Sequence, residues 1–164
     1  MNVRLAGAGD VETVGDLMDE ASAWVNDLGH AQWTRPFPRD TLAATVSREE
    51  VYVADVEGRT VATITVLEDD PLYWGERPPD ALYVHKLVVR RDHAGRGLGA
   101  ALVEWVDERA AEAGRQFLRL DCLRDDPDIR AYYERLGFEH CGDFDDGGRG
   151  LQLSLYERPV RATL

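Results

Sequence analysis

The hexamer from Gly95 to Ala100 reads Gly-Arg-Gly-Leu-Gly-Ala and lies between a strand-like run and an amphipathic helical pattern. The run before it, residues 82–89, is rich in β-branched and aromatic side chains that favour strands. After it, residues 98–106 are apolar at the three- and four-residue spacing of one buried helix face. Glycines at such a turn let backbone amides approach an anion at a helix N-terminus. The sequence therefore predicts a site for a phosphate or pyrophosphate.

The glycine spacing distinguishes between phosphate-binding motifs. A dinucleotide fingerprint has the spacing G-x-G-x-x-G early in a βαβ unit, whereas these glycines follow G-x-G-x-G past the middle of the chain. A Walker motif needs Lys and then Ser or Thr after its last glycine, and Ala100 and Ala101 supply neither. Neither nucleotide-binding interpretation is favoured.

Residues 94–99 resemble the acyl-CoA-binding motif of the GNAT superfamily of N-acyltransferases, which reads Arg or Gln, two residues, Gly, one residue, then Gly or Ala. Ala94 stands where the family has Arg or Gln, so the local charge would come from Arg96, or from His93 and Arg91. Residues 133–138 are similar to the family's Tyr-x-x-x-Gly-Phe element, where a helix ends on glycine and a strand begins. Two motifs in this order make a stronger resemblance than either alone.

The resemblance implies that acetyl-CoA is the acyl donor and that backbone amides of the glycine loop bind its pyrophosphate. It also implies an oxyanion donor on the preceding strand, near Val89. Asp126 stands where related chains often carry an Asn that contacts CoA. The expected acetyl-CoA contacts are Leu87, Val88, Val89, Ala94, Gly95, Arg96, Gly97, Leu98, Gly99, Ala100 and Asp126.

Acyl transfer to an amine needs a neutral amine, donors for the oxyanion and a proton for the departing thiolate. Strand alternation puts Tyr83 and His85 on one face of the strand before the loop. Because an imidazole titrates near neutral pH, His85 is the candidate base, with a role as a partly buried core histidine left open. The resemblance implies that Tyr133 is the acid, and simple packing on a short helix is its alternative.

The resemblance puts the acceptor pocket at the first two helices and the loop before the central strand. Aromatic and acidic side chains there would suit an amine through cation–π contacts and charge pairing, although packing also explains the aromatic residues. The candidate acceptor-binding residues are Trp33, Tyr73, Trp74 and Tyr83, with Glu68, Asp69, Asp70 and Glu76 nearby.

The net charge of −12 argues against nucleic acid and an anionic membrane surface as partners. It favours a cationic acceptor, or it serves only solubility. No run reaches the apolar length of a membrane span, and the first residues lack a signal-peptide core, so we expect a cytoplasmic protein. Cys122 and Cys141 are expected to be reduced. Four scattered histidines without a spaced Cys/His cluster predict no metal site.

The pattern along the chain predicts one domain, residues 1–164, of the α/β class. The expected fold is a GNAT-like mixed, mostly antiparallel sheet flanked by helices, in the order βααβββαβαββ. The expected strands are 2–6, 51–56, 60–67, 82–89, 116–122, 138–144 and 151–156. The expected helices are an 18-residue one after Asp10, one over 40–47, one over 97–113 and one from Pro127 to Gly137. Residues 68–80 are expected to form a long loop.

These features together predict an N-acetyltransferase that moves an acetyl group from acetyl-CoA to a primary amine, with a small-molecule acceptor. One alternative is a non-catalytic acyl-CoA-binding or regulatory module. Another is an acetyltransferase acting on protein N-termini or lysines. A homodimer is left open by the sequence.

Overall fold

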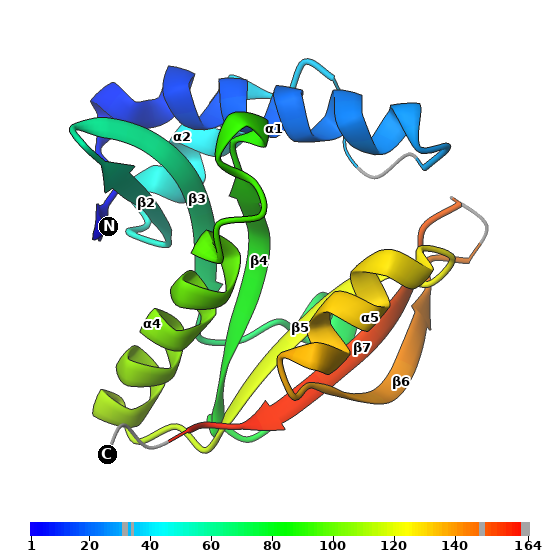
Figure 1. Cartoon of the computed structure of the whole chain (residues 1–164). Coiled ribbons are helices and arrows are strands. Elements are labelled where there is room, and N and C mark those ends of the chain that lie inside the picture. Colours follow the sequence, from blue (N-terminus) through cyan, green and yellow to red (C-terminus); the bar gives the residue numbers. More distant parts are fainter. Residues whose placement is uncertain (31–32, 34, 148–149, 162–164) are drawn as a thin grey trace. The chain divides into compact units, whose positions relative to one another are not determined.

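The computed structural model describes residues 1–164 except 31–32, 34, 148–149 and 162–164 (Figure 1). In this described part, seven strands form one mixed sheet in the order β1-β2-β3-β4-β5-β7-β6. The strands are β1 (Asn2–Leu5), β2 (Val51–Val56), β3 (Arg59–Leu67), β4 (Ala81–Val89), β5 (Phe117–Leu123), β6 (Glu139–Asp145) and β7 (Gln152–Pro159). The helices are α1 (Val11–Asp27), α2 (Arg39–Ser47), α3 (Pro71–Trp74), α4 (Leu98–Glu112) and α5 (Pro127–Arg135).

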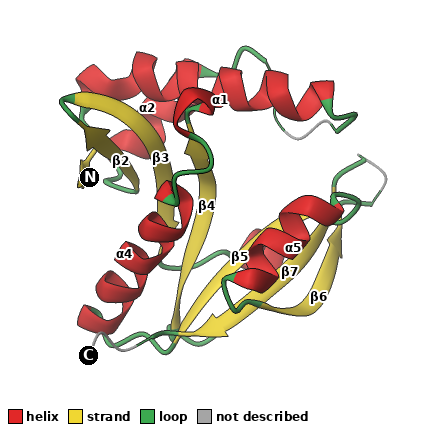
Figure 2. Cartoon of the chain, viewed as in Figure 1, coloured by secondary structure: helices red, strands yellow, loops and turns green. Residues whose placement is uncertain are grey.

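The predicted fold class is confirmed, and most predicted element ends lie within one residue of the observed ones (Figure 2). The predicted loop over 68–80 is the main correction, because it contains the single-turn helix α3. Pro71 occupies the first helical turn and Gly75, with φ of 68°, follows the last residue. A helix of one turn is too short to show a periodic apolar pattern. Strand β7 is also longer than predicted and runs on to Pro159.

The chain divides into two compact units, Met1–Val66 with Lys86–Leu102 and Leu67–His85 with Val103–Leu164. We call these the first and second units. Strand β4 and helix α4 each contribute residues to both. The expectation of a single domain over 1–164 stays a prediction.

The first unit contains the antiparallel strands β1, β2 and β3 together with α1 and α2. Along α1, Val14, Leu17 and Met18 recur at three- and four-residue spacing, which places them on one buried helix face. They share a hydrophobic core with Ala6, Phe37, Leu42, Val46, Val51, Val53 and Val88. The second half of β4 leads from this core into the glycine loop.

The second unit is built around β5, which pairs in parallel with β4 and antiparallel with β7. Strand β6 pairs with the other side of β7, and α5 lies along β5 and β7 (Figure 1). Trp74 of α3 packs against Tyr83 of β4 and Leu155 of β7 in a small hydrophobic cluster. Among the described residues, no helix combines the length and apolar character needed to span a membrane.

Helices α3 and α5 cover opposite faces of these strands. Trp74 of α3 packs edge-on against Tyr83, whose hydroxyl accepts a hydrogen bond from Arg119 of β5. On the other side, Arg130 of α5 donates a hydrogen bond to the hydroxyl of Tyr156. Tyr156 of β7 pairs with Leu120, which follows Arg119 along β5. Successive residues of a strand point to opposite faces. We call the two surfaces the α3 face and the α5 face.

Candidate active site

The glycine loop of the first unit joins β4 to α4 through a short 3-10 turn, Arg91–His93. Gly95 and Gly97 both have φ of 76°, a left-handed conformation that favours glycine over other residues. The amide of Ala101 donates to the carbonyl of Gly97 at 3.0 Å, and this is the first hydrogen bond of the helical pattern at the start of α4. Amides that precede it in the first turn have no such acceptor and are available to an anion.

The basic side chains around this loop differ in whether they already form ion pairs or ring contacts within the protein. Asp92 forms ion pairs with Arg59, Arg90 and His93, and these contacts hold the pKa of its carboxyl well below the usual range, His93 contributing most. Arg91 stacks its guanidinium on the ring of Trp24, 3.9 Å from the centroid. Of the three cations that could replace the missing Arg or Gln at Ala94, exposed Arg96 alone has no ion pair or ring contact among the described residues.

Strand β4 carries a local distortion where it approaches the loop. Lys86 has φ of 49°, which is uncommon for a residue with a side chain and costs about 1–3 kcal/mol. Its ammonium lies 5.7 Å from the ring centroid of Phe37. Val88 is buried in the core of the first unit, whereas Leu87 and Val89 are half-buried. An amide of this segment as oxyanion donor stays a prediction.

In the second unit, His85 lies between two carboxylates on the α3 face. Its Nε2 is 2.9 Å from Oδ2 of Asp70, which precedes α3, and its Nδ1 is 3.8 Å from Oδ2 of Asp121 on β5. The side chains of His85, Asp70 and Asp121 are only 15%, 6% and 9% exposed. Two acidic groups from distant parts of the sequence therefore lie beside the predicted base.

Tyr73 is the one aromatic acceptor candidate that lies beside His85, with ring centroids 6.3 Å apart. Burial, followed by the charges of Asp121 and Asp70, raises the pKa of its phenol, so the hydroxyl stays protonated. The ring also packs edge-on against Phe144 at 4.9 Å. Tyr73 thus places a protonated phenol ring next to the imidazole.

The other acceptor candidates have packing roles. Trp74 and Tyr83 are buried and pack edge-on with ring centroids 5.9 Å apart, and the Tyr83 hydroxyl accepts a hydrogen bond of 2.9 Å from Arg119. These two residues form core contacts on the α3 face, in line with the packing alternative. Trp33, in the first unit, packs against that unit's core, and its carbonyl accepts a hydrogen bond from Ser22.

Tyr133 is buried on α5 and packs edge-on against Tyr132 at 5.2 Å and Phe138 at 5.9 Å. Burial raises the pKa of its phenol far above the usual value, which keeps the hydroxyl protonated at neutral pH. Its hydroxyl makes no hydrogen bond with any described residue and remains able to donate a proton. Cys122, the buried thiol nearby, has a pKa raised to about 12 by burial, so it is not a reactive thiolate. Cys122 and Cys141 are free, as predicted.

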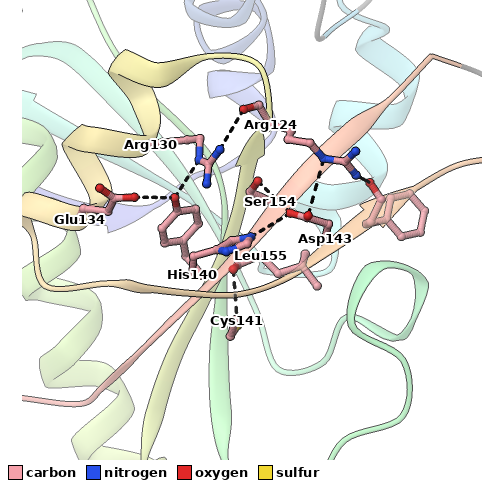
Figure 3. A network of polar contacts seen from close by, with 10 residues as sticks. Arg124, Arg130, Glu134, His140, Cys141, Asp143, Ser154 and Leu155 are labelled. Atoms are coloured by element: carbon pink, nitrogen blue, oxygen red, sulfur yellow. Dashed lines mark hydrogen bonds and ion pairs between the residues drawn. The ribbon is translucent and has the colours of Figure 1, made fainter.

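Helix α5, which carries Tyr133, is fixed at both ends and along its length. Asp126 caps its start, because Oδ1 accepts hydrogen bonds from the amides of Asp128 at 3.1 Å and Ile129 at 3.2 Å. Arg130 of the helix donates to the hydroxyl of Tyr156, which in turn donates to Glu134 at 2.9 Å (Figure 3). Asp126, predicted as a CoA contact, therefore has a structural role at the helix N-terminus.

A second polar network near the same strands lies at the surface. His140 of β6 is 2.8 Å from Oδ1 of Asp143, which also accepts a hydrogen bond from Ser154 (Figure 3). The thiol of Cys141 donates to the carbonyl of Leu155. The His140–Asp143 pair is about 40% exposed on both side chains, in contrast to the buried pair of His85 and Asp70.

The loop geometry, the buried Tyr133 and the Gly137 turn match the two motifs seen in the sequence. The sequence model of the Acetyltransferase (GNAT) family matches residues 18–138, which include both motifs. The chain belongs to the GNAT acetyltransferase family. It is an acyltransferase of the EC 2.3.1 class, and members of this family use acetyl-CoA as donor.

Known GNAT proteins resemble this family member over almost its whole length. It is 27% identical to the N-acetyltransferase YesJ of Bacillus subtilis, across 93% of this chain and 87% of that protein. A GNAT acetyltransferase of Listeria monocytogenes superposes with a TM-score of 0.79 at 24% identity, covering 97% of this chain and 94% of the other. A Salmonella typhimurium acetyltransferase, solved with its cofactor acetyl-CoA, has a TM-score of 0.72 at 17% identity and covers 100% and 96%. The structural matches show the shared fold.

The residues of this GNAT protein fit the acetyl-CoA that its family uses. A Cβ at Gly95 or Gly97 would meet no heavy atom within 4 Å, so the space beside the loop is open. Arg96 adds an exposed cation, and the first-turn amides add donors. Asp70, which the sequence placed near the acceptor pocket, and Asp121, which the sequence did not single out, are 51 residues apart. They meet at His85 because β4 and β5 run side by side and the segment before α3 lies on the same face.

Proposed function

We propose that this enzyme transfers the acetyl group of acetyl-CoA to a primary amine of a small-molecule acceptor that arrives as an ammonium ion. One observation carries the proposal. Two carboxylates, that of buried Asp70 and that of half-buried Asp121, flank a single imidazole, that of His85, in the unit that also holds Tyr133. An ammonium ion must be attracted, desolvated and deprotonated before it can attack, and these groups suit the three tasks.

The proposed roles follow from the position of each group. The carboxylates stabilise the arriving ammonium, and His85 accepts its proton. On the opposite face, the protonated hydroxyl of Tyr133 donates a proton to the leaving sulfur. The glycine loop binds the pyrophosphate through its free amides, and an amide of the 87–89 segment supports the oxyanion. Acetyl-CoA supplies the activated thioester when bound.

The acidic surface supports a cationic acceptor. Glu68, Asp69 and Glu76 are exposed on the segment around α3, and the whole chain has a net charge of −12. Attraction between exposed charges is screened over about 8 to 10 Å at ordinary salt. We therefore expect the KM for the acceptor to rise with ionic strength, while the KM for acetyl-CoA, itself an anion, does not rise in parallel.

A turnover screen tests the proposal. Release of the free CoA thiol is measured with panels of alkylamines, polyamines, amino sugars, amino acids and peptides. Turnover confined to cationic primary amines, with salt-sensitive KM, is expected. Better turnover of neutral or anionic acceptors, or a KM independent of salt, would contradict the cationic acceptor. Selective turnover of peptides would favour the protein N-terminus or lysine alternative.

Ala94 departs from the Arg or Gln of the family motif, and this departure favours one alternative function, a module that binds acyl-CoA without catalysis. Such a module would bind CoA but would release no free thiol with any acceptor. The retained Tyr133 argues for the enzyme. We also propose a cytoplasmic location, supported by the two free cysteines, which a reducing compartment preserves.

A further inference from the structure

Asp70, His85 and Asp121 form a cluster. The two carboxylate oxygens and the imidazole nitrogen that could bind a metal ion all lie within 4.8 Å of one another. The three residues come from three segments, the residue before α3, strand β4 and strand β5, all in the second unit. Each is fixed by structure around it: Asp70 accepts the amide of Trp74 through its carbonyl, and the β4–β5 register runs to Val84–Leu120, one residue before His85 and Asp121. The cluster is therefore held by backbone geometry.

The contact between His85 and Asp70 is close without being a hydrogen bond. Nε2 and Oδ2 are 2.9 Å apart, yet both atoms are buried and neither has a hydrogen-bond partner among the described residues. The side chain of Asp70 is 94% buried, and His85 is its one ion-pair partner in the described structure. Leaving a buried carboxylate oxygen without a donor is costly. A nitrogen and an oxygen at this spacing, with no hydrogen bond between them, are arranged as two ligands of one ion would be.

The donor set of the cluster also suits a cation. Two carboxylates and one imidazole face one another on the α3 face. A divalent ion would bring two positive charges to the carboxylates while bonding the neutral imidazole.

We propose that Asp70, His85 and Asp121 bind a divalent metal ion such as Zn²⁺. One imidazole nitrogen and two carboxylate oxygens are ligands that such ions accept, at about 2.0 to 2.2 Å. Ligand atoms bound at that length lie about 3 to 3.5 Å apart, so small side-chain rotations bring the three atoms into range. The ligands lie 15 and 36 positions apart in the sequence and show no metal-binding spacing, which is why the sequence predicted no metal site.

A bound ion would regulate the enzyme. It would occupy the imidazole lone pair that the proposed proton transfer needs, so we expect Zn²⁺ to inhibit acetyl transfer and a chelator to restore it. This regulatory part rests on the proposed function. The binding part does not, because it is measured on the protein without acetyl-CoA or acceptor.

The test is calorimetric titration of Zn²⁺ into the untagged full chain after treatment with a chelator. One ion per chain should bind, and Asp70→Asn should weaken binding by roughly tenfold or more, a loss seen even for groups that only support metal ligands. Asp143→Asn is the matched control, since it removes a carboxylate from the exposed pair with His140. It should bind Zn²⁺ as the wild type does.

Three results would overturn the proposal: no saturable binding to the wild type, equal binding to wild type and Asp70→Asn, or loss of binding in Asp143→Asn. Equal binding to Asp70→Asn, or loss of binding in Asp143→Asn, would mean that the protein binds only an adventitious ion at another place. Circular dichroism checks that Asp70→Asn is folded, and if it is not, Asp121→Asn takes its place with the same expected loss. Absence of acetyl transfer to every tested amine would contradict the proposed function and leave the binding result standing.

Discussion

His85 and Tyr133 lie on opposite faces of the β5 strand region in the second unit. His85 shares the α3 face with Asp121, whereas Tyr133 packs on the α5 face near Cys122, the next residue of β5. A proton taken from the acceptor and a proton given to the sulfur would therefore pass through different groups in different surroundings. Substituting one should leave the surroundings of the other intact, so the two roles can be tested independently.

Replacing Tyr133 by Phe tests the acid. We expect kcat to fall by about 10²- to 10⁴-fold, the usual contribution of a positioned acid, while CoA affinity changes little. Tyr132→Phe, which alters the half-buried neighbour, is the control and should stay near wild type. Steady-state thiol release measures kcat, and calorimetry measures CoA affinity. A near wild-type kcat without a pre-steady-state burst would remove the acid role from Tyr133.

Replacing His85 by Ala tests the base. We expect a fall in kcat of about 10²- to 10⁴-fold, partly restored by added imidazole, because a free base can replace the missing one. A residue that only packs in the core would show no such rescue. His140→Ala removes the exposed histidine of β6 and should leave kcat unchanged. Full activity of His85→Ala would assign deprotonation to water.

Replacing Gly97 by Val tests the pyrophosphate loop. Because Gly97 has φ of 76°, a side chain adds backbone strain of about 1–2 kcal/mol besides blocking the anion. Gly58→Val is the matched control, since Gly58 has φ of 79° and equally open space in the β2–β3 turn. Both variants should lose similar stability, but only Gly97→Val should lose CoA affinity, by roughly tenfold or more, equal to about 1.4 kcal/mol.

Equal CoA affinity in a folded Gly97→Val protein would place the pyrophosphate elsewhere. In the same assay, Ala94→Arg restores the residue type that the family motif has at this position. We expect it to bind CoA as tightly as the wild type or more tightly, because it adds a cation beside the loop. Weaker binding would mean that the loop has no room for the longer side chain.

Replacing Asp126 separates helix capping from CoA binding. Asp126→Ala should reduce the free energy of unfolding by about 1 kcal/mol, because the amides of Asp128 and Ile129 lose their acceptor. Asp126→Asn keeps a capping oxygen and should be nearly as stable as wild type. Urea denaturation measures both. If Asp126→Asn also tightens CoA binding, residue 126 contacts CoA as well.

The ion pairs of Arg4 predict how stability depends on pH. Arg4 bonds Asp10 and lowers the pKa of its carboxyl, and Thr60 and then Arg4 lower the pKa of Asp55. A carboxyl whose pKa is lowered on folding stabilises the protein above its ordinary pKa of about 3.9, and this contribution is lost as pH falls through the lowered value. Arg4→Gln should therefore be less stable at neutral pH and lose less on acidification. Urea denaturation between about pH 7 and pH 2.5 measures the slope, and parallel curves for both proteins would refute the assignment.

The sequence by itself determined the elements and the loop. Apolar spacing predicted α1 and α4, a Val-rich run predicted β4, alternating apolar and polar residues predicted β5, and three glycines after a strand predicted the turn. These signals are local, since each depends on residues within one or two turns of one another. For the same reason α3 was missed, because one turn between Pro71 and Gly75 is too short to carry a period.

Only the tertiary structure decided which side chains meet. Asp70 and Asp121 reach His85 because β5 runs parallel to β4 and the segment before α3 covers the same face, and no sequence spacing encodes such long-range pairing. Likewise, the burial of Tyr83 and Trp74 against Arg119 comes from the tertiary structure, whereas their role in the acceptor pocket stays a prediction. Strand alternation assigns a residue to a face, but what covers that face depends on segments far away in the chain.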